Sequence, residues 1–431
     1  MWFGAAVVGL AFGVQAISPN PPEGHWVDTW VSMPQLTEST NLPSPPFNGT
    51  TGVFENSTIR QTIHTSVGGK QIRLRISNNF GDSNLEITAA TVALPLNGSS
   101  GVSAIQVNTL VPLSFSGSNG ILIPNGALAV SDPIDFTIQP QSELAISLYL
   151  ANGQGGFDIT SHPGSRATSW FTFGDATSAE NITGTSVVNA QHWFFISALE
   201  VWSPPSVRSF AIVGDSITDG RGSTTDGNDR WPDQLLARMQ TNPPTSQIAV
   251  INQAAGGNRI LADGLGPAAQ GRIERDVLAH PNVGFAMIFE GVNDIGTAPT
   301  TTEAQAAVTQ RLIQAYKQII SRVHTNGIPM FAATITPFGS PQNSTVIQPY
   351  DDPTREVSRQ TINKWIRTSG AFDGVIDFDA ILRDPTNSSK LRLEFDSGDG
   401  LHPNTAGYRA VAQAFPLDLF TNFTKGVSGF Q

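Results

Sequence analysis

The hydrophobic pattern of this chain changes once, at Ser203–Ser206 (Ser-Pro-Pro-Ser), and that change constrains the fold more than any other feature. Before this segment, apolar and polar residues alternate with the period of a half-buried strand; after it, short apolar runs alternate with segments of helical period. A proline pair ends strands and stiffens a chain, as a linker does. Since 431 residues are too many for one ordinary domain, we expect an all-β domain over 17–205 and an α/β domain over 206–431.

Residues 26 to 202 have the pattern of strands joined by turns. In Ile72–Ile76, isoleucine and leucine alternate with arginine, which indicates a half-buried strand. The pair Gly68-Gly69 separates this strand from a similar run at Ile59–Ile63 and suits a tight hairpin turn. No window has helical periodicity, so we expect a β-sandwich or jelly roll.

The C-terminal half alternates between apolar runs and helical segments. Its clearest helix starts with a capping box from Thr300 to Glu303 and stops at Asn326-Gly327. Alternation of this kind implies a parallel sheet covered on both faces, a flavodoxin-like three-layer α/β/α arrangement whose ligands bind beyond the carboxyl ends of the strands. The apolar runs are Ser209–Val213, Ile248–Ile251, Phe285–Phe289, Met330–Ile335 and Val375–Phe378.

Two features predict export from a eukaryotic cell. Residues 1–16 are mostly apolar and end in Val14-Gln15-Ala16, which fits a signal peptide with a small-residue cleavage site. Seven Asn-x-Ser/Thr sequons favour a glycosylated extracellular protein. Cysteine is absent, which excludes disulfides and thiolate chemistry, and a chain of this size can rely on its core instead. The sequons begin at Asn48, Asn56, Asn97, Asn181, Asn343, Asn387 and Asn422.

The formal net charge of −11 argues against nucleic acid or an anionic membrane as the partner. Beyond the first 16 residues no stretch is long and apolar enough for a membrane span. No spacing of histidines and carboxylates suggests a metal site, and no motif calls for an organic cofactor. We therefore expect a monomer that works without a cofactor.

Four short peptides in the C-terminal half contain the residues that could take part in catalysis. Ser216 follows a predicted strand through a Gly-Asp turn, where a hydroxyl can become a nucleophile if a base reaches it. His402 is the candidate base, and Asp399 can hold its tautomer and stabilise the imidazolium. Taken alone, Ser216 would suit a turn, and Asp399 and His402 would suit a helix cap. The peptides are GDSI at 214–217, NQAAGGN at 252–258, GVND at 291–294 and DGLH at 399–402.

The same peptides supply donors that could stabilise a developing oxyanion. Gly256-Gly257 follows a strand, and glycine lets the backbone approach a substrate without a Cβ. Asn293 offers a side-chain amide at the end of another strand, and the backbone N–H of Ser216 completes the set. Asp215 is expected to have a structural role in the turn. An isolated glycine pair would more often be a plain turn.

Of the six other histidines, the four in the β region lack a carboxylate in a comparable local frame, and the other two lie in a loop before a proline and near the end of a long helix. We expect all six to be surface or core residues. Four tryptophans of the β region could stack on sugars, but their size favours the core. The histidines are His25, His64, His162, His192, His280 and His324; the tryptophans are Trp26, Trp30, Trp170 and Trp193.

Taken together, the four peptides resemble the blocks of the SGNH (GDSL-type) hydrolase family over about residues 207–415. The resemblance implies Ser216 as the nucleophile, Asp399 and His402 as its partners, and Gly257 and Asn293 as oxyanion donors with the Ser216 N–H. The sequence around these peptides resembles that of a two-domain, acetylxylan-esterase-like subgroup of secreted carbohydrate esterases with an N-terminal β module. Ala254-Ala255 departs from the Gly-Ile that is frequent in that subgroup.

The resemblance implies a secreted serine esterase acting on short acyl esters, such as acetyl groups on a polysaccharide. One alternative is a lipase or phospholipase, although the loops 221–230 and 262–271 beside the motifs are polar and rich in glycine. Another is a glycan-binding protein whose hydrolase domain is inert.

Overall fold

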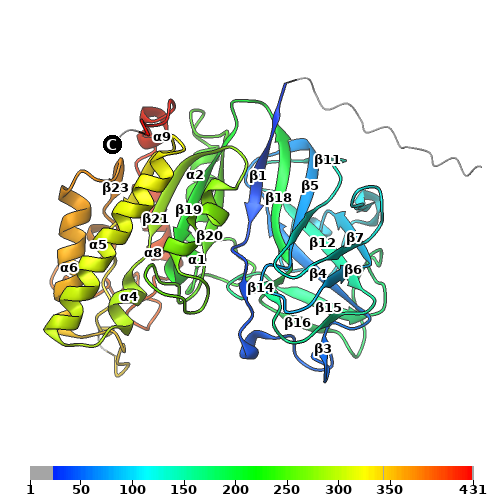
Figure 1. The fold of residues 1–431 in the computed structure, drawn as a ribbon, viewed down its shortest axis with the longest axis horizontal. Coiled ribbons are helices and arrows are strands. Elements are labelled where there is room, and N and C mark those ends of the chain that lie inside the picture. The colour runs from blue at the N-terminus through cyan, green and yellow to red at the C-terminus, as the bar shows by residue number, and fades with distance from the viewer. Residues whose placement is uncertain (1–22, 343, 430–431) are drawn as a thin grey trace, which may run out of the picture.

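The computed structural model describes residues 23–342 and 344–429. The signal peptide expected over residues 1–16 and the sequon at Asn343 lie outside the described residues. Figure 1 shows an all-β region and a region of mixed helices and strands side by side along the long axis.

The N-terminal region is built on two antiparallel sheets, as the sequence predicts. Their facing sides share one hydrophobic core that includes Ile59 and Leu74. The first sheet consists of β1 (His25–Val31), β18 (Ile196–Ser203), β5 (Gly69–Ser77), β10 (Leu128–Val130) and β11 (Ile134–Ile138). The second consists of β16 (Val188–Ala190), β15 (Ser169–Phe173), β4 (Ser57–His64), β12 (Glu143–Leu150), β7 (Ala89–Ala93) and β8 (Val111–Pro112).

Three short pairings complete this region, and its helical segments within the described residues are single 3₁₀ turns. The pairings join β2 (Gln35–Leu36) with β14 (Thr160–His162) and β17 (Trp193–Phe194), β3 (Gly52–Val53) with β13 (Gln154–Gly155), and β6 (Leu85–Ile87) with β9 (Ile121–Ile123).

The predicted hairpin at Gly68-Gly69 is wrong. The strands on either side, β4 and β5, belong to different sheets, so the chain crosses from one sheet to the other between them. Both glycines serve close approaches instead of a turn. A Cβ on Gly68 would lie 2.6 Å from the Ile138 carbonyl oxygen, and one on Gly69 would lie 2.3 Å from Val201 Cγ2.

The segment predicted as a linker forms a tight turn. β18 ends at Ser203, the N–H of Val207 donates to the carbonyl of Pro204 at 3.0 Å, and β19 begins at Arg208. The chain therefore passes from antiparallel to parallel pairing within a few residues.

The C-terminal region contains a five-stranded parallel sheet in the order β20-β19-β21-β22-β23, which is the flavodoxin-like 2-1-3-4-5 order. β19 lies between β20 and β21, where its near-continuous apolar sequence is buried on both faces. The strands are β19 (Arg208–Gly214), β20 (Ile248–Ala254), β21 (Val283–Phe289), β22 (Met330–Ala333) and β23 (Gly374–Ile376).

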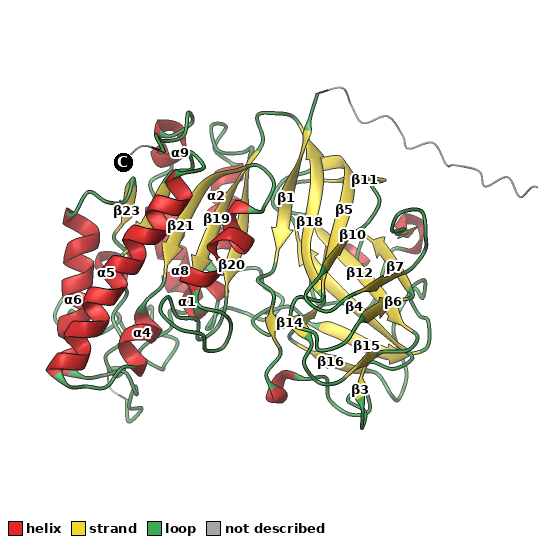
Figure 2. Cartoon of the chain, viewed as in Figure 1, coloured by secondary structure: helices red, strands yellow, loops and turns green. Residues whose placement is uncertain are grey.

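Helices cover both faces of this sheet, with α5 on one face and α8 on the other (Figure 2). The long helix α5 buries Val308, Leu312 and Ile319. It begins one residue later than expected, because Thr301 and not Thr300 is the N-cap and accepts from the Ala304 N–H. The helices are α1 (Ser216–Asp219), α2 (Trp231–Gln240), α3 (Ala269–Ile273), α4 (Val292–Thr297), α5 (Thr302–His324), α6 (Pro353–Thr368), α7 (Phe378–Leu382), α8 (Thr405–Ala414) and α9 (Asp418–Asn422), with a π-helical turn at Glu274–Leu278. Within the described ranges no helix is long and apolar enough to cross a membrane.

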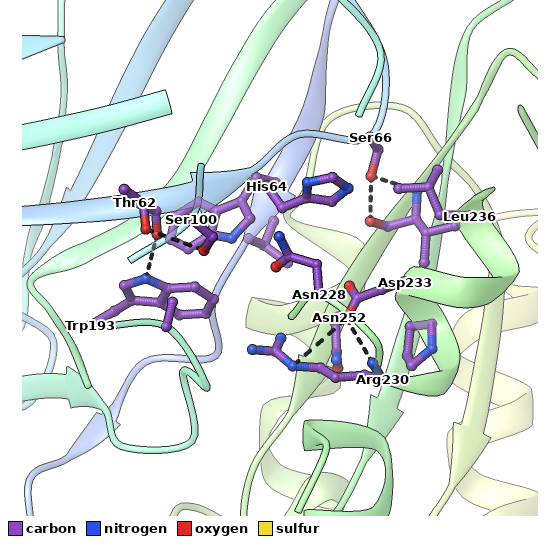
Figure 3. A pocket seen from close by; sticks show the side chains of 15 residues that line it. Thr62, His64, Ser66, Ser100, Trp193, Asn228, Arg230, Asp233, Leu236 and Asn252 are labelled. Carbon is purple, nitrogen blue, oxygen red and sulfur yellow. Dashed lines mark hydrogen bonds and ion pairs between the residues drawn. The ribbon is translucent and has the colours of Figure 1, made fainter. Parts of the chain in front are cut away.

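The two regions pack closely where β1 lies beside β20 (Figure 1). The hydroxyl of Ser66 donates to the Val250 carbonyl at 2.8 Å across this junction. A cavity of about 30 Å³ lies here, lined by both polar and apolar side chains, with His64 on one side and Arg230 and Asp233 at the start of α2 on the other (Figure 3). That volume suits a water or two and is far too small for a substrate, and its lining does not include Ser216.

Candidate active site

A chain of two hydrogen bonds joins Ser216, His402 and Asp399. Ser216 Oγ lies 2.7 Å from His402 Nε2, and His402 Nδ1 lies 2.6 Å from Asp399 Oδ2. Ser216 follows β19, whereas Asp399 and His402 lie in the loop before α8. His402 is 186 residues from Ser216 in the sequence. The fold brings together the three residues that the sequence singles out.

Ser216 is presented by the short helix α1 that starts immediately after β19. Asp215 is the N-cap of this helix, and its Oδ1 accepts from the Ile217 N–H at 3.0 Å. Gly214 must lack a side chain here, because a Cβ would lie 2.6 Å from Thr218 Oγ1. Asp215 has the structural role expected of it.

The carboxylate of Asp399 is also held by the backbone of its own loop, residues 399–402, which we call the histidine loop. Its Oδ1 accepts from the N–H groups of Leu401 and His402, both at 2.9 Å, which leaves Oδ2 for the imidazole. Burial acts to raise the pKa of Asp399, but the hydrogen bonds and the charge of His402 hold the pKa well below its usual range. The carboxylate therefore stays ionised and keeps the proton of the neutral imidazole on Nδ1. This tautomer leaves Nε2 as an acceptor for the Ser216 hydroxyl.

Two backbone N–H groups are free to act as oxyanion donors. Within the described residues, neither the Ser216 nor the Gly257 N–H has a hydrogen-bond acceptor. Gly257 has a φ of 69°, in the left-handed region that favours glycine. A Cβ there would lie 2.7 Å from Leu265 Cδ1, so the position also lacks room for a side chain.

Asn293 lies in α4 just beyond β21, and its amide contacts the Gly257 loop. Its Nδ2 donates to the Asn258 carbonyl at 2.8 Å, and its Oδ1 accepts from the Tyr350 hydroxyl at 3.0 Å. Asn293 is therefore held next to Gly257, as an oxyanion pair requires.

Two buried side chains hold these loops together. Asp294 accepts from the N–H groups of Ile260 and Leu261, each at 2.9 Å, which ties α4 to the Gly257 loop. Arg272, 1% exposed, donates to the Asn258 side chain and to the Gln253 carbonyl beneath them. Asp294 belongs to the GVND peptide, but the sequence analysis assigns it no role, and Arg272 lies outside all four peptides.

Four other histidines also lie beside carboxylates, all of them distant in sequence and so invisible to a search for local pairs. None of these four imidazoles has a serine hydroxyl as a hydrogen-bond partner within the described residues, which distinguishes them from His402. The pairs are His64–Glu143, His162–Asp219, His280–Asp28 and His324–Asp373, at 2.7–2.9 Å.

The tryptophans divide into two groups. Trp30 and Trp193 are buried and pack edge to face with ring centroids 4.9 Å apart, so they belong to the core. Trp26 and Trp170 are half-buried; Trp26 lies 4.4 Å below the Arg73 guanidinium, and Trp170 Nε1 donates to the Gly101 carbonyl. Among the described residues no group of histidines and carboxylates could hold a metal ion.

Residues 212–410 match the GDSL-like Lipase/Acylhydrolase family. This part of the chain is a GDSL-type acylhydrolase domain. The family resemblance expected from the four peptides is thereby confirmed, as are the α/β fold and the enzymatic class of carboxylic ester hydrolase. The matched residues begin just before the GDSI peptide and end beyond His402, so all four peptides lie inside the GDSL-type domain.

Solved structures similar to the GDSL-type domain include a carbohydrate acetylesterase family member from Sinorhizobium meliloti (18% identity, 48% of this chain, 95% of that chain, TM-score 0.36). A GDSL-like lipase from Bacteroides thetaiotaomicron (14% identity, 50% and 89%, TM-score 0.36) and an acetyl xylan esterase (21% identity, 48% and 96%, TM-score 0.35) are also similar. No curated protein matches the chain.

Proposed function

We propose that this protein is a serine esterase in which Ser216 is the nucleophile, His402 the general base and Asp399 the residue that orients His402. The observation that carries this proposal is the 2.7 Å contact between Ser216 Oγ and His402 Nε2, continued by the 2.6 Å contact to Asp399. A hydroxyl with a base in hydrogen-bond reach, and a base oriented by a third group, is what nucleophilic acyl transfer requires.

In the proposed mechanism, Ser216 Oγ attacks the ester carbonyl carbon while its proton passes to His402 Nε2. The N–H groups of Ser216, Gly257 and Asn293 donate to the oxyanion of the tetrahedral intermediate. His402 then returns the proton to the leaving alcohol, and the acyl group remains on Ser216. A water molecule, deprotonated by His402, releases the acid and restores the enzyme.

For the substrate, we propose a short acyl ester on a carbohydrate, acetyl being the first choice. The resemblance of the four peptides to acetylxylan-esterase-like proteins supports this assignment. A polar side chain beside the catalytic pair suits a hydroxylated alcohol: Arg221, whose side chain is 63% exposed, has its Nε 3.9 Å from Asp399 Oδ2. Acetate release from a panel of acetylated polysaccharides would identify the alcohol.

The nucleophile and the base are tested by Ser216→Ala and His402→Asn with p-nitrophenyl acetate as substrate. Each variant is expected to lose at least about a thousandfold in kcat, because neither the nucleophile nor its activation can be replaced. His64→Asn is the matched control, since His64 lies 2.7 Å from Glu143 but contacts no serine hydroxyl. Turnover by Ser216→Ala at the wild-type rate would exclude the proposal.

Two rival functions give different outcomes. A lipase would gain activity as the acyl chain of the substrate lengthens from acetate to palmitate, and the apolar Leu265 beside Gly257, 51% exposed, is the side chain to test for such a preference. A glycan-binding protein with an inert hydrolase domain would not be labelled at Ser216 by a fluorophosphonate. We expect highest activity on acetate and stoichiometric labelling.

We also propose that the protein is secreted, glycosylated and monomeric. The described sequons support glycosylation, because all of their asparagines are exposed except Asn48, which is half-buried. Expression in a eukaryotic host should give secreted protein whose apparent mass falls on treatment with an endoglycosidase. Retention in the cell with no mass change would exclude this part of the proposal.

A further inference from the structure

The hydrogen bonds of Asn293 leave one N–H of its amide free. Its Nδ2 donates to a backbone carbonyl, that of Asn258, which can only accept, and this bond fixes which end of the amide carries nitrogen. Its Oδ1 accepts from the hydroxyl of Tyr350. The second N–H of Nδ2 has no acceptor among the described residues and remains available to an oxyanion.

The ring of Tyr350 is fixed against the same helix that carries Asn293. It lies on the backbone of Gly296 in α4, where a Cβ would come within 2.3 Å of the ring. Phe338 meets the ring edge-on with centroids 6.4 Å apart, and the Arg355 guanidinium lies 6.0 Å from its centroid. The hydroxyl therefore has a defined position relative to the amide.

The segment that carries Tyr350 also contacts the histidine loop. Gln348, which is 6% exposed, accepts from the Tyr350 N–H at 3.2 Å and donates to the Asp399 carbonyl at 2.7 Å. Two residues of one segment thus contact the oxyanion asparagine and the carboxylate loop.

We propose that Tyr350 is a positioning residue for the oxyanion hole, whose hydroxyl holds the Asn293 amide so that its free N–H faces the reacting carbonyl oxygen. This proposal rests on the esterase function proposed above. A preorganised donor needs no reorientation as charge develops, which is how such groups lower the barrier. Burial and the nearby Asp215 raise the pKa of Tyr350, so the phenol remains a donor at the pH of catalysis.

Tyr350→Phe tests this role, because it removes the hydroxyl and keeps the ring on Gly296. We expect kcat for p-nitrophenyl acetate to fall about fivefold to tenfold, the effect of one neutral hydrogen bond, with KM nearly unchanged. Tyr149→Phe is the matched control, since the Tyr149 hydroxyl also donates to an asparagine Oδ1, that of Asn56, at 2.9 Å. That control should keep the wild-type kcat, and both variants should keep the wild-type melting temperature to within a few degrees.

A double-mutant cycle separates positioning from a direct role of Tyr350. In an Asn293→Ala background, Tyr350→Phe should cause no further loss, because its effect passes through the amide. The rate of Ser216 labelling by a fluorophosphonate gives the same comparison if turnover becomes too slow. An equal loss in both backgrounds, or wild-type kcat in Tyr350→Phe alone, would overturn the proposal. Neither result bears on the esterase function, which fails only if Ser216→Ala stays active.

Discussion

The side chain of Asp399 is 34% exposed, and although the rest of it is buried, its interactions keep it charged. Two backbone N–H groups and the imidazole of His402 occupy its oxygens, and they outweigh the burial that would raise its pKa. Asp399→Asn should lower kcat for p-nitrophenyl acetate by roughly a hundredfold to ten-thousandfold, because the amide no longer fixes the productive tautomer. A loss below about tenfold would mean that the carboxylate is dispensable.

The pH dependence of the reaction should follow from the same residues. The pKa of Asp399 is lowered, so this residue remains ionised well below neutral pH. We therefore expect kcat/KM to fall as the pH decreases, since a protonated base cannot accept the serine proton. A second inflection above about pH 4, lost in Asp399→Asn, would contradict this assignment.

Asp215 should make stability depend on pH in the opposite sense to an ordinary surface carboxylate. Burial, with the neighbouring Asp294 and Asp219, raises its pKa from 3.8 to about 7. Between these values the unfolded chain loses a proton that the folded chain keeps, so the free energy of unfolding decreases as the pH rises from about 4 to 7. In Asp215→Asn this decrease should be smaller by on the order of 1–4 kcal/mol, measured by urea unfolding at pH 5 and pH 8. An identical pH dependence in wild type and variant would show that Asp215 does not contribute.

The conformation of the loop that contains Gly257 requires glycine at this one position, because of its backbone angle and its contact with Leu265. Gly257→Ala would force a left-handed backbone on alanine and press its Cβ against Leu265. We expect stability to fall by about 1–2 kcal/mol, and kcat to fall with it as the N–H shifts. Adding Leu265→Ala should restore only the part of the lost stability that is due to the clash, because the backbone strain at position 257 remains. Full recovery in the double variant would show that the positive φ costs nothing here.

Motifs and hydrophobic periodicity predict the elements well, but not the contacts between them. The apolar runs gave the parallel strands, and the four peptides gave Ser216, Gly257, Asn293 and the Asp399 to His402 loop, because each of these signals is local. Tyr350 lies in a segment with no periodicity, and its bond to Asn293 joins residues 57 apart. Gly68-Gly69 misled for the same reason: a glycine needed for close packing against another strand looks like a turn glycine when only its neighbours are known.

The β region contributes directly to the core around the active site and is not a separate appendage. Val31 and Ala198 from its strands β1 and β18 belong to the hydrophobic core of the parallel sheet, and Ala249 of β20 belongs to the core of the β region. Such shared cores favour unfolding as one unit. Sequence analysis could not find this interface, because it depends on which faces of distant strands meet.

His162 joins this interface to Ser216, the proposed nucleophile. Its Nε2 lies 2.9 Å from Oδ1 of Asp219, the last residue of the helix that begins at Ser216, and both side chains are buried. The other oxygen of Asp219 has no hydrogen-bond partner among the described residues, and Gly164 lets the β-region backbone come close to it, since a Cβ there would lie 1.7 Å away. The β region thus holds the far end of the helix that presents Ser216.

Removing this contact should therefore weaken the fold and the catalyst together. His162→Ala leaves a buried carboxylate without its donor, which is expected to cost about 2–3 kcal/mol in urea unfolding and to lower kcat severalfold as α1 loosens. His192→Ala is the control, because that imidazole bonds to the Pro163 carbonyl within the β region and, among the described residues, to no residue of the helix that begins at Ser216. It should cost about 1 kcal/mol and leave kcat unchanged. If His162→Ala lowered stability but kept the wild-type kcat, the β region would support the fold without positioning Ser216.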